Sequence, residues 1–389
     1  MLRWLYLAMS AIFLSGSVSH AEISQQTIAA YNEAISNADP AQIEQAAKQL
    51  AEAAMSEPNH PDAALMAFEA AWSLCQIEQC EAGREAAAFA AAQPANGYPS
   101  EPIRQVLISY IDWTGKDTRK TRRTLDAALL ELQADDVTTL SITVFQSKIF
   151  ADLRDTRWEN AATLSKAAID HFETVANEIP SRLNMMRLLS VTSAFNADPD
   201  YTHLALMAEL EAQFDLERVR AEQISESGTA PTWMDDLYWR AYAWRLAIEA
   251  FVRTVEPSKL RRVDVQEIQA PYAREIESLR QSIEDVPIET DERAPFCENG
   301  QFNMRPPIRY PRSAAFKGRF GAVIASVSVR NGKPSDVQIL SAVPLEGFAS
   351  AVEETVRKWV WEPADGTDLS NCDLHRDNII MPFVFSIEG

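Results

Sequence analysis

The sequence predicts two unlike parts, a long helical array followed by a small α+β domain. Residues 22–285 are rich in Ala, Leu, Glu, Gln and Arg, and their apolar residues recur at helical spacing. Residues 296–389 instead contain alternating apolar runs that are typical of strands. Residues 286–295 are polar, acidic and proline-containing, which indicates a linker. We therefore expect an all-α array of helical hairpins, then an antiparallel sheet packed on a helix.

The N-terminus has the layout of a secretory signal peptide over residues 1–21. Arg3 precedes an apolar stretch from Leu5 to Leu14, and Ser19-His20-Ala21 supplies small residues at the cleavage positions. An uncleaved membrane anchor is the alternative. A spanning helix needs about 20 apolar residues, however, and serines and a glycine interrupt this stretch from Ser15 onward. We expect cleavage after Ala21, export and a soluble mature protein.

Four cysteines agree with export, because an even number in an exported chain indicates disulfides. Three connectivities are possible, and we expect the local pairs Cys75–Cys80 and Cys297–Cys372. The second would close a loop of about 75 residues and stabilise the fold by roughly 4 kcal/mol. A cysteine–zinc site is the competing interpretation, but the paired short spacings and nearby histidines of such sites are missing.

The charge is unevenly distributed along the chain. Residues 22–294 have a net charge of −20, whereas residues 295–389 have a net charge of −1. An acidic helical region is repelled by phosphate backbones and by anionic headgroups, so we do not expect nucleic-acid binding. Solvation of the helical surface is the simpler explanation of the negative net charge of this region.

The helical region contains a weak internal repeat. Two D-T-R triplets begin at Asp117 and Asp155, 38 residues apart, and Cys80 lies a similar distance before the first. The sequence around each of these three positions predicts a helix, a polar turn and a second helix. This period resembles tetratricopeptide-type hairpins, whose stacks often hold a partner protein on a concave surface. A helical solenoid with a further protein partner is our expectation, and an irregular helical bundle is the alternative.

The C-terminal region predicts a hairpin, a helix and a final strand. In the first strand Val323, Ala325, Val327 and Val329 point one way, which marks a half-buried strand. Asn331-Gly332 favours a tight hairpin turn, because both residues tolerate positive φ. The helix carries an apolar stripe that runs from Phe348 to Trp359.

The final strand, from Ile379 to Ile387, is expected at an edge of the sheet. Pro382 lacks a backbone donor, which confines this strand to an edge or to irregular pairing. A free edge presents unpaired N–H and C=O groups that can accept an extended peptide as an added strand. The residues alone therefore predict a peptide-binding module.

In this order and spacing, residues 303–388 resemble the C-terminal domain of the TonB energy-transducer family. The motifs are Tyr310-Pro311, Gly321 before the first strand, V-Q-I-L-S-A at 337–342, and W-V-W-E-P at 359–363. The resemblance implies a periplasmic domain of Gram-negative bacteria that captures the TonB box of outer-membrane receptors by strand addition. It implies energy from the proton-motive force through inner-membrane partners of the ExbB and ExbD type. The implied contact residues are Tyr310, Pro311, Ile379, Ile380, Met381, Pro382, Phe383, Val384, Phe385, Ser386 and Ile387.

Two functions remain open from the sequence. A transducer needs a membrane anchor and a long proline-rich segment, and here a cleavable signal and an acidic helical region stand in their places. The first hypothesis is a TonB-like protein that binds receptors and is linked to transport. The second is an exported scaffold that uses the domain for protein binding without energy transduction. An N-terminus retained in the inner membrane would favour the first.

Catalysis is not expected. The chain contains no H-E-x-x-H, no G-x-S-x-G and no phosphate-binding glycine loop. The histidines His60, His171, His203 and His375 are scattered along the chain. We expect no cofactor and no metal.

Overall fold

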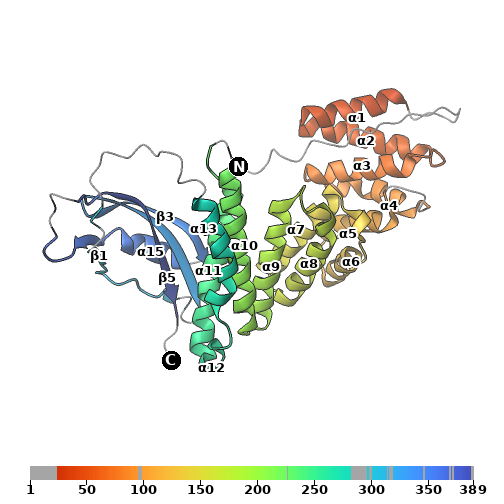
Figure 1. The fold of residues 1–389 in the computed structure, drawn as a ribbon. Coiled ribbons are helices and arrows are strands. Elements are labelled where there is room, and N and C mark those ends of the chain that lie inside the picture. The colour runs from red at the N-terminus through yellow and green to blue at the C-terminus, as the bar shows by residue number, and fades with distance from the viewer. Residues whose placement is uncertain are drawn as a thin grey trace. The chain divides into compact units, whose positions relative to one another are not determined.

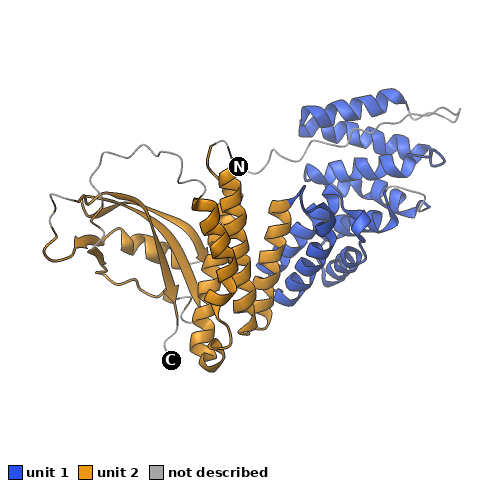
Figure 2. Ribbon diagram, in the orientation of Figure 1, with its two compact units in different colours: residues 1–179 blue, residues 180–389 orange. Residues whose placement is uncertain are grey.

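The structure, a computed structural model, consists of two compact units, residues 1–179 and 180–389 (Figure 2). It describes residues 24–94, 99–225, 227–281, 296–297, 300–312, 314, 319–344, 347–367, 369 and 372–386. The predicted signal peptide, the predicted linker and Ile387 lie outside these residues. The expected boundary between helical array and sheet domain falls within the second unit, and it remains a proposal.

The first unit is entirely helical over its described residues (Figure 1). Each helix packs mainly on its neighbours in sequence, as stacked hairpins do. The helices are α1 (Gln25–Asn37), α2 (Pro40–Ser56), α3 (Ala63–Gln76), α4 (Arg84–Ala92), α5 (Glu101–Gly115), α6 (Arg119–Leu130), α7 (Thr139–Arg154) and α8 (Trp158–Phe172). The helical region is thus confirmed, while the tetratricopeptide-type solenoid stays a prediction.

The two D-T-R triplets occupy equivalent turns, one before α6 and one before α8. The Thr118 hydroxyl accepts from the N–H of Thr121 and so caps α6. Arg122 donates to Asp155 at 3.0 Å, which joins the first triplet's turn to the second. The repeat that the sequence shows is therefore a pair of adjacent, ion-paired turns.

A buried lysine links α6 to α7. Lys148 is fully buried, and its Nζ lies 2.7 Å from Asp126 and 2.6 Å from Asp152. Two carboxylates around one ammonium provide the charge pairing that burial of a lysine requires. Removing Lys148 would leave both carboxylates without that cation.

Both predicted disulfides are confirmed. Cys75 is bonded to Cys80 in the turn between α3 and α4. Cys297 is bonded to Cys372 across a separation of 75 residues. The second bond joins the start of the C-terminal domain to the segment just before its last strand.

Over its described residues the second unit contains five helices before its strands. Helix α11 packs on α9 and α10, and α13 packs on α10. Leu237, Ile248 and Val252 of α11 are buried in the core that these helices share. The helices are α9 (Pro180–Ala197), α10 (Thr202–Ile224), α11 (Thr232–Val255), α12 (Pro257–Leu260) and α13 (Val265–Gln281). No helix among the described residues is long and apolar enough to cross a bilayer.

The main sheet has three antiparallel strands in the order β3-β2-β5. The predicted hairpin is confirmed, because Asn331 and Gly332 form the turn with φ of 53° and 73°. The strands are β2 (Gly321–Arg330), β3 (Lys333–Val343) and β5 (Arg376–Phe385), with α15 (Phe348–Val356) after β3. Strands β1 (Gly300–Asn303) and β4 (Val360–Pro363) form a separate antiparallel pair.

Strand β2 is buried on both faces, which corrects the expectation of a half-buried strand. Val323, Ala325, Val327 and Val329 pack with α15, as the alternation predicts. The opposite residues Ala322 and Ile324 are also fully buried, against Ala243 and Ala247 of α11. The sheet thus lies between α15 and α11 (Figure 1). The expected fold class, helices followed by a small antiparallel sheet domain, is confirmed.

Candidate functional site: a groove along the outer edge of β5

Strand β5 is an edge strand, as the proline in its sequence predicts. It pairs with β2 on one side, and no described strand pairs with its other side. The neighbouring helix α11 contacts β5 as well as β2 and β3. The outer side of β5 is therefore where an additional strand could pair.

The position of Pro382 fixes which backbone groups face outward. Pro382 lies opposite Ile324, and this pair cannot exchange hydrogen bonds because proline has no N–H. In an antiparallel ladder such a pair directs its backbone groups away from the neighbouring strand. It follows that Ile380 and Val384, two residues away on either side, also face outward. The outer edge then offers the N–H groups of Ile380 and Val384 and the C=O groups of all three residues.

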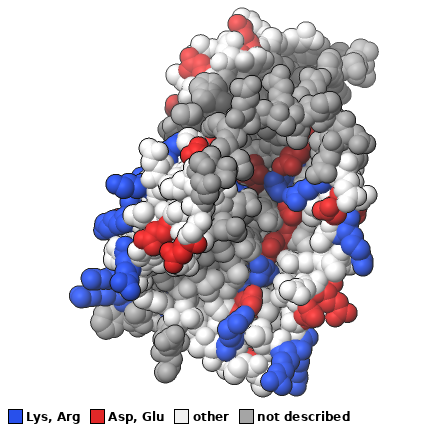
Figure 3. Space-filling model, turned by 60° about the vertical axis from the view of Figure 1, so that its left-hand side comes forward, with Lys and Arg blue, Asp and Glu red and all other residues white. Residues whose placement is uncertain are grey.

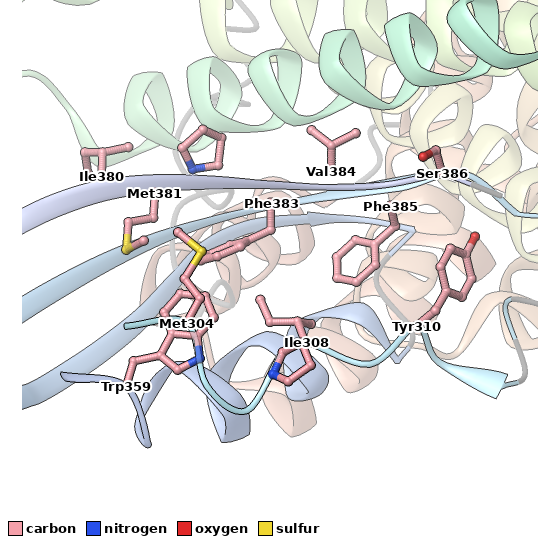
Figure 4. A pocket seen from close by; sticks show the side chains of 12 residues that line it. Met304, Ile308, Tyr310, Trp359, Ile380, Met381, Phe383, Val384, Phe385 and Ser386 are labelled. Atoms are coloured by element: carbon pink, nitrogen blue, oxygen red, sulfur yellow. The ribbon is translucent and has the colours of Figure 1, made fainter. Parts of the chain in front are cut away.

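A groove of about 700 Å³ runs along this edge (Figure 4). Most of its lining side chains are apolar, and one wall comes from β5 while the other comes from the segment before Tyr310. The lining residues are Met304, Pro307, Ile308, Tyr310, Trp359, Ile380, Met381, Pro382, Phe383, Val384, Phe385 and Ser386. The groove follows β5 from Ile380 to Phe385 and extends to Ser386, so its shape suits an extended segment better than a compact ligand.

The side chains of β5 alternate between two environments. Met381, Phe383 and Phe385 pack on the core that includes α15. Ile380 and Val384 lie on the other side of the strand and are 40% and 47% exposed (Figure 4). A half-exposed apolar pair beside the unpaired edge of a strand is an unusual surface, because edges are commonly protected by charge.

Contacts between distant segments hold the second wall in place. Trp359 Nε1 donates to the Pro306 carbonyl at 2.8 Å, which fixes the segment from Met304 to Ile308 to the end of α15. The Tyr310 hydroxyl donates to the Arg319 carbonyl. The Tyr310 ring packs edge-on against Phe348 and Phe385. Tyr310 is therefore a wall of the groove as well as part of the core.

The groove is poor in titratable side chains. Tyr310 is the one titratable side chain among the lining residues, and burial raises its pKa. No group of three or more metal-ligating side chains occurs within the described part of the chain. None of the lining residues is charged, and Figure 3 shows Lys and Arg along the left border and also at the right and lower parts of the face that it draws. Such a groove can bind an apolar chain through side-chain burial and backbone hydrogen bonds.

The structure brings most of the predicted contact residues together. Tyr310 and all residues from Ile380 to Ser386 line the groove. Ile379 instead packs on the core, and Pro311 is not among the lining residues. Met304, Pro307, Ile308 and Trp359 were not predicted. Met304, Pro307 and Ile308 could have been found in the sequence, because they are apolar residues just before Tyr310-Pro311.

Comparisons with known proteins concern the C-terminal domain alone. No curated protein and no solved structure matches the chain. One family model matches residues 306–374, a range that includes Tyr310-Pro311, the hairpin, α15 and the tryptophans that follow this helix, and that ends just before β5. That model is the Gram-negative bacterial TonB protein C-terminal family, so the expected resemblance of this domain to TonB is confirmed.

Proposed function

We propose that the groove along β5 binds an extended peptide, which adds to the sheet as a further strand beside β5. The observation that carries this proposal is the unpaired apolar edge with its outward N–H groups at Ile380 and Val384. Main-chain hydrogen bonds would supply affinity, and the apolar walls would select the side chains of the peptide. The protein then acts as a binding protein and not as an enzyme.

The similarity of residues 306–374 to TonB indicates a TonB-like domain with a role in the Gram-negative envelope. From it we propose that the peptide is the TonB box of an outer-membrane receptor and that the protein works in the periplasm. A link to energy-dependent transport would require ExbB- and ExbD-type partners and an anchored N-terminus. We keep this link apart from the proposed peptide binding, because the N-terminal pattern predicts cleavage after Ala21.

Calorimetry with a TonB-box peptide tests strand addition. We expect saturable binding by the full chain, and a weaker complex for Val384→Pro, which removes one outward N–H. A hydrogen bond contributes about 1 kcal/mol, so affinity should fall about fivefold or more. Val384→Ala is the matched control, because it trims the side chain and keeps the N–H. The proposal fails if the unaltered protein does not bind, or if Val384→Pro binds no worse than Val384→Ala.

A scaffold is the second candidate, and the stacked hairpins of α1–α8 favour it. In that case the first unit binds a protein of its own. Crosslinking in cells should then join residues 22–179 to a specific partner in the presence or absence of receptors. Crosslinks from the β5 groove alone would count against the scaffold.

A further inference from the structure

Helix α6 carries a cationic outer face in an otherwise acidic protein. Arg119, Lys120 and Arg123 are exposed, and Lys116 is exposed in the turn just before them. Within the described residues none of these four side chains has an ion-pair partner, whereas Arg122 between them pairs with Asp155. The paired arginine serves the fold, and the other four cations are available to a partner.

These cations occupy an unfavourable place in the helix. The N-terminal turns of a helix carry the positive end of its macrodipole, and acidic residues are favoured there. The first turn of α6 contains no acidic residue, and it begins with Arg119 and Lys120. Solvation alone does not require positive charge at this end, since aspartate or glutamate would solvate the turn and stabilise the helix. Recognition of an anionic partner does require it.

The neighbouring turn carries a further exposed basic side chain. Arg122 of α6 bonds to Asp155, which places the end of α7 beside the start of α6. The last turn of α7 carries Arg154, whose Nε lies 3.6 Å from Asp155 and whose side chain is still 75% exposed, and Phe150 one turn earlier, which is 46% exposed. Leu130, at the end of α6, is 50% exposed. The surface therefore combines long basic side chains with isolated apolar ones.

The net charge of −20 does not cancel this surface. The Debye length at physiological ionic strength is about 8 Å, so acidic residues farther away are largely screened from the patch. The long-range repulsion expected from the acidic region would instead orient the protein, with this face toward an anionic surface. The basic patch is therefore the part of the acidic helical region that an anionic surface would attract.

We propose that Lys116, Arg119, Lys120, Arg123 and Arg154 dock the first unit on an anionic lipid bilayer. The patch lies on exposed helix ends and turns, and basic helices with apolar side chains at their borders are typical of membrane-surface contacts. The headgroup phosphates are the ligands, and Phe150 and Leu130 lie at the borders of the contact. This surface is separate from the β5 groove and does not depend on the function proposed for it.

Vesicle sedimentation tests the proposal with the chain from Glu22 onward, which keeps every described residue. Vesicles that contain phosphatidylglycerol should bind the protein, and vesicles of phosphatidylcholine alone should not. Each basic residue near an anionic surface strengthens partitioning about fivefold, so the triple variant Arg119→Gln, Lys120→Gln, Arg123→Gln should bind about a hundredfold more weakly. Binding should also weaken as the salt concentration rises.

The matched control is the variant Arg240→Gln, Arg261→Gln, Arg274→Gln, which removes the same charge from exposed sites on the second unit. It should bind the vesicles as the unaltered chain does. Equal losses in both triple variants would show an effect of net charge and would overturn the proposal. So would equal binding to both kinds of vesicle, or binding to a soluble polyanion such as polyphosphate without binding to vesicles. Circular dichroism and unfolding midpoints establish that the variants are folded.

Discussion

Separating the C-terminal sheet from helix α11 is expected to leave the sheet domain only marginally stable. Ala322, Ile324 and Val343 are buried against α11 and face away from α15. In a chain that starts at residue 296 these side chains would be exposed to water. Full burial of a valine or isoleucine contributes about 1.5–3 kcal/mol, so Val343 and Ile324 together account for about 3–6 kcal/mol.

That amount is a large part of the stability of a domain, which is typically about 5–15 kcal/mol. We therefore expect residues 180–389 to unfold cooperatively in urea and to remain monomeric. Residues 296–389 should unfold at a much lower urea concentration or associate through the uncovered face of the sheet. Circular dichroism, tryptophan fluorescence and gel filtration of the two fragments measure the difference.

The substitution Ile324→Ala, made in both fragments, tests the contribution of α11 directly. In residues 180–389 it should cost about 2–4 kcal/mol, because it opens a cavity beneath α11. In residues 296–389 the same change should cost under about 1 kcal/mol, since no helix covers the side chain there. Equal urea midpoints for the two fragments, or equal effects of Ile324→Ala in both, would refute the stabilising role of α11.

Three further predictions concern single features of the chain. Pro382→Val should restore an outward N–H on β5 and strengthen TonB-box binding about fivefold in calorimetry, because one more hydrogen bond forms. Opening the 75-residue loop by Cys297→Ser and Cys372→Ser should lower the free energy of urea unfolding by about 4 kcal/mol, and opening the shorter disulfide by only about 2 kcal/mol. Burial raises the pKa of Glu69 from 4.5 to about 7, so the unfolded carboxyl loses its proton first as the pH rises. The free energy of unfolding should then fall by about 3 kcal/mol from pH 4.5 to pH 7, and Glu69→Gln should lack that part of the fall.

The local elements could be predicted from the sequence because their signals are local. Asn331-Gly332 identified the hairpin turn, and the alternation from Val323 to Val329 identified the residues that face α15. The same alternation cannot tell whether the opposite face meets water or another element. Ile324 and Ala322 lie against Ala243 and Ala247, about 80 residues earlier in the chain, and no local period encodes that pairing.

The helix that covers this face did carry a signal of its own. Along α11, apolar residues fall on two sides of the helix: Leu237 and Ile248 belong to the helical core, whereas Ala243 and Ala247 pack against the sheet. A helix with apolar residues on more than one side is buried on more than one face. This pattern indicates that α11 has two packing partners, although it cannot name the sheet as the second one.

The sequence predicted the groove residues that lie on β5, but it did not predict those of the opposite wall. The strand residues follow from the alternation around Pro382 and from the family resemblance. The second wall depends on a hydrogen bond from Trp359 to Pro306, residues that are 53 positions apart. Met304 and Ile308 become part of the site only through that long-range contact.

The two edges of the main sheet differ in a way that supports peptide binding. The edge strand β3 begins with Lys333 and Pro334 and exposes Asp336 and Gln338, which are features that discourage pairing with another strand. The edge strand β5 also begins with exposed charged residues, Arg376 and Asp377, and contains Pro382, but it exposes Ile380 and Val384 beside an apolar groove as well. An exposed apolar stretch on an edge is a liability for aggregation unless a partner strand covers it. Since α11 and α15 already occupy the two faces of β2, the outer side of β5 is the part of the described sheet that remains suited to an added strand.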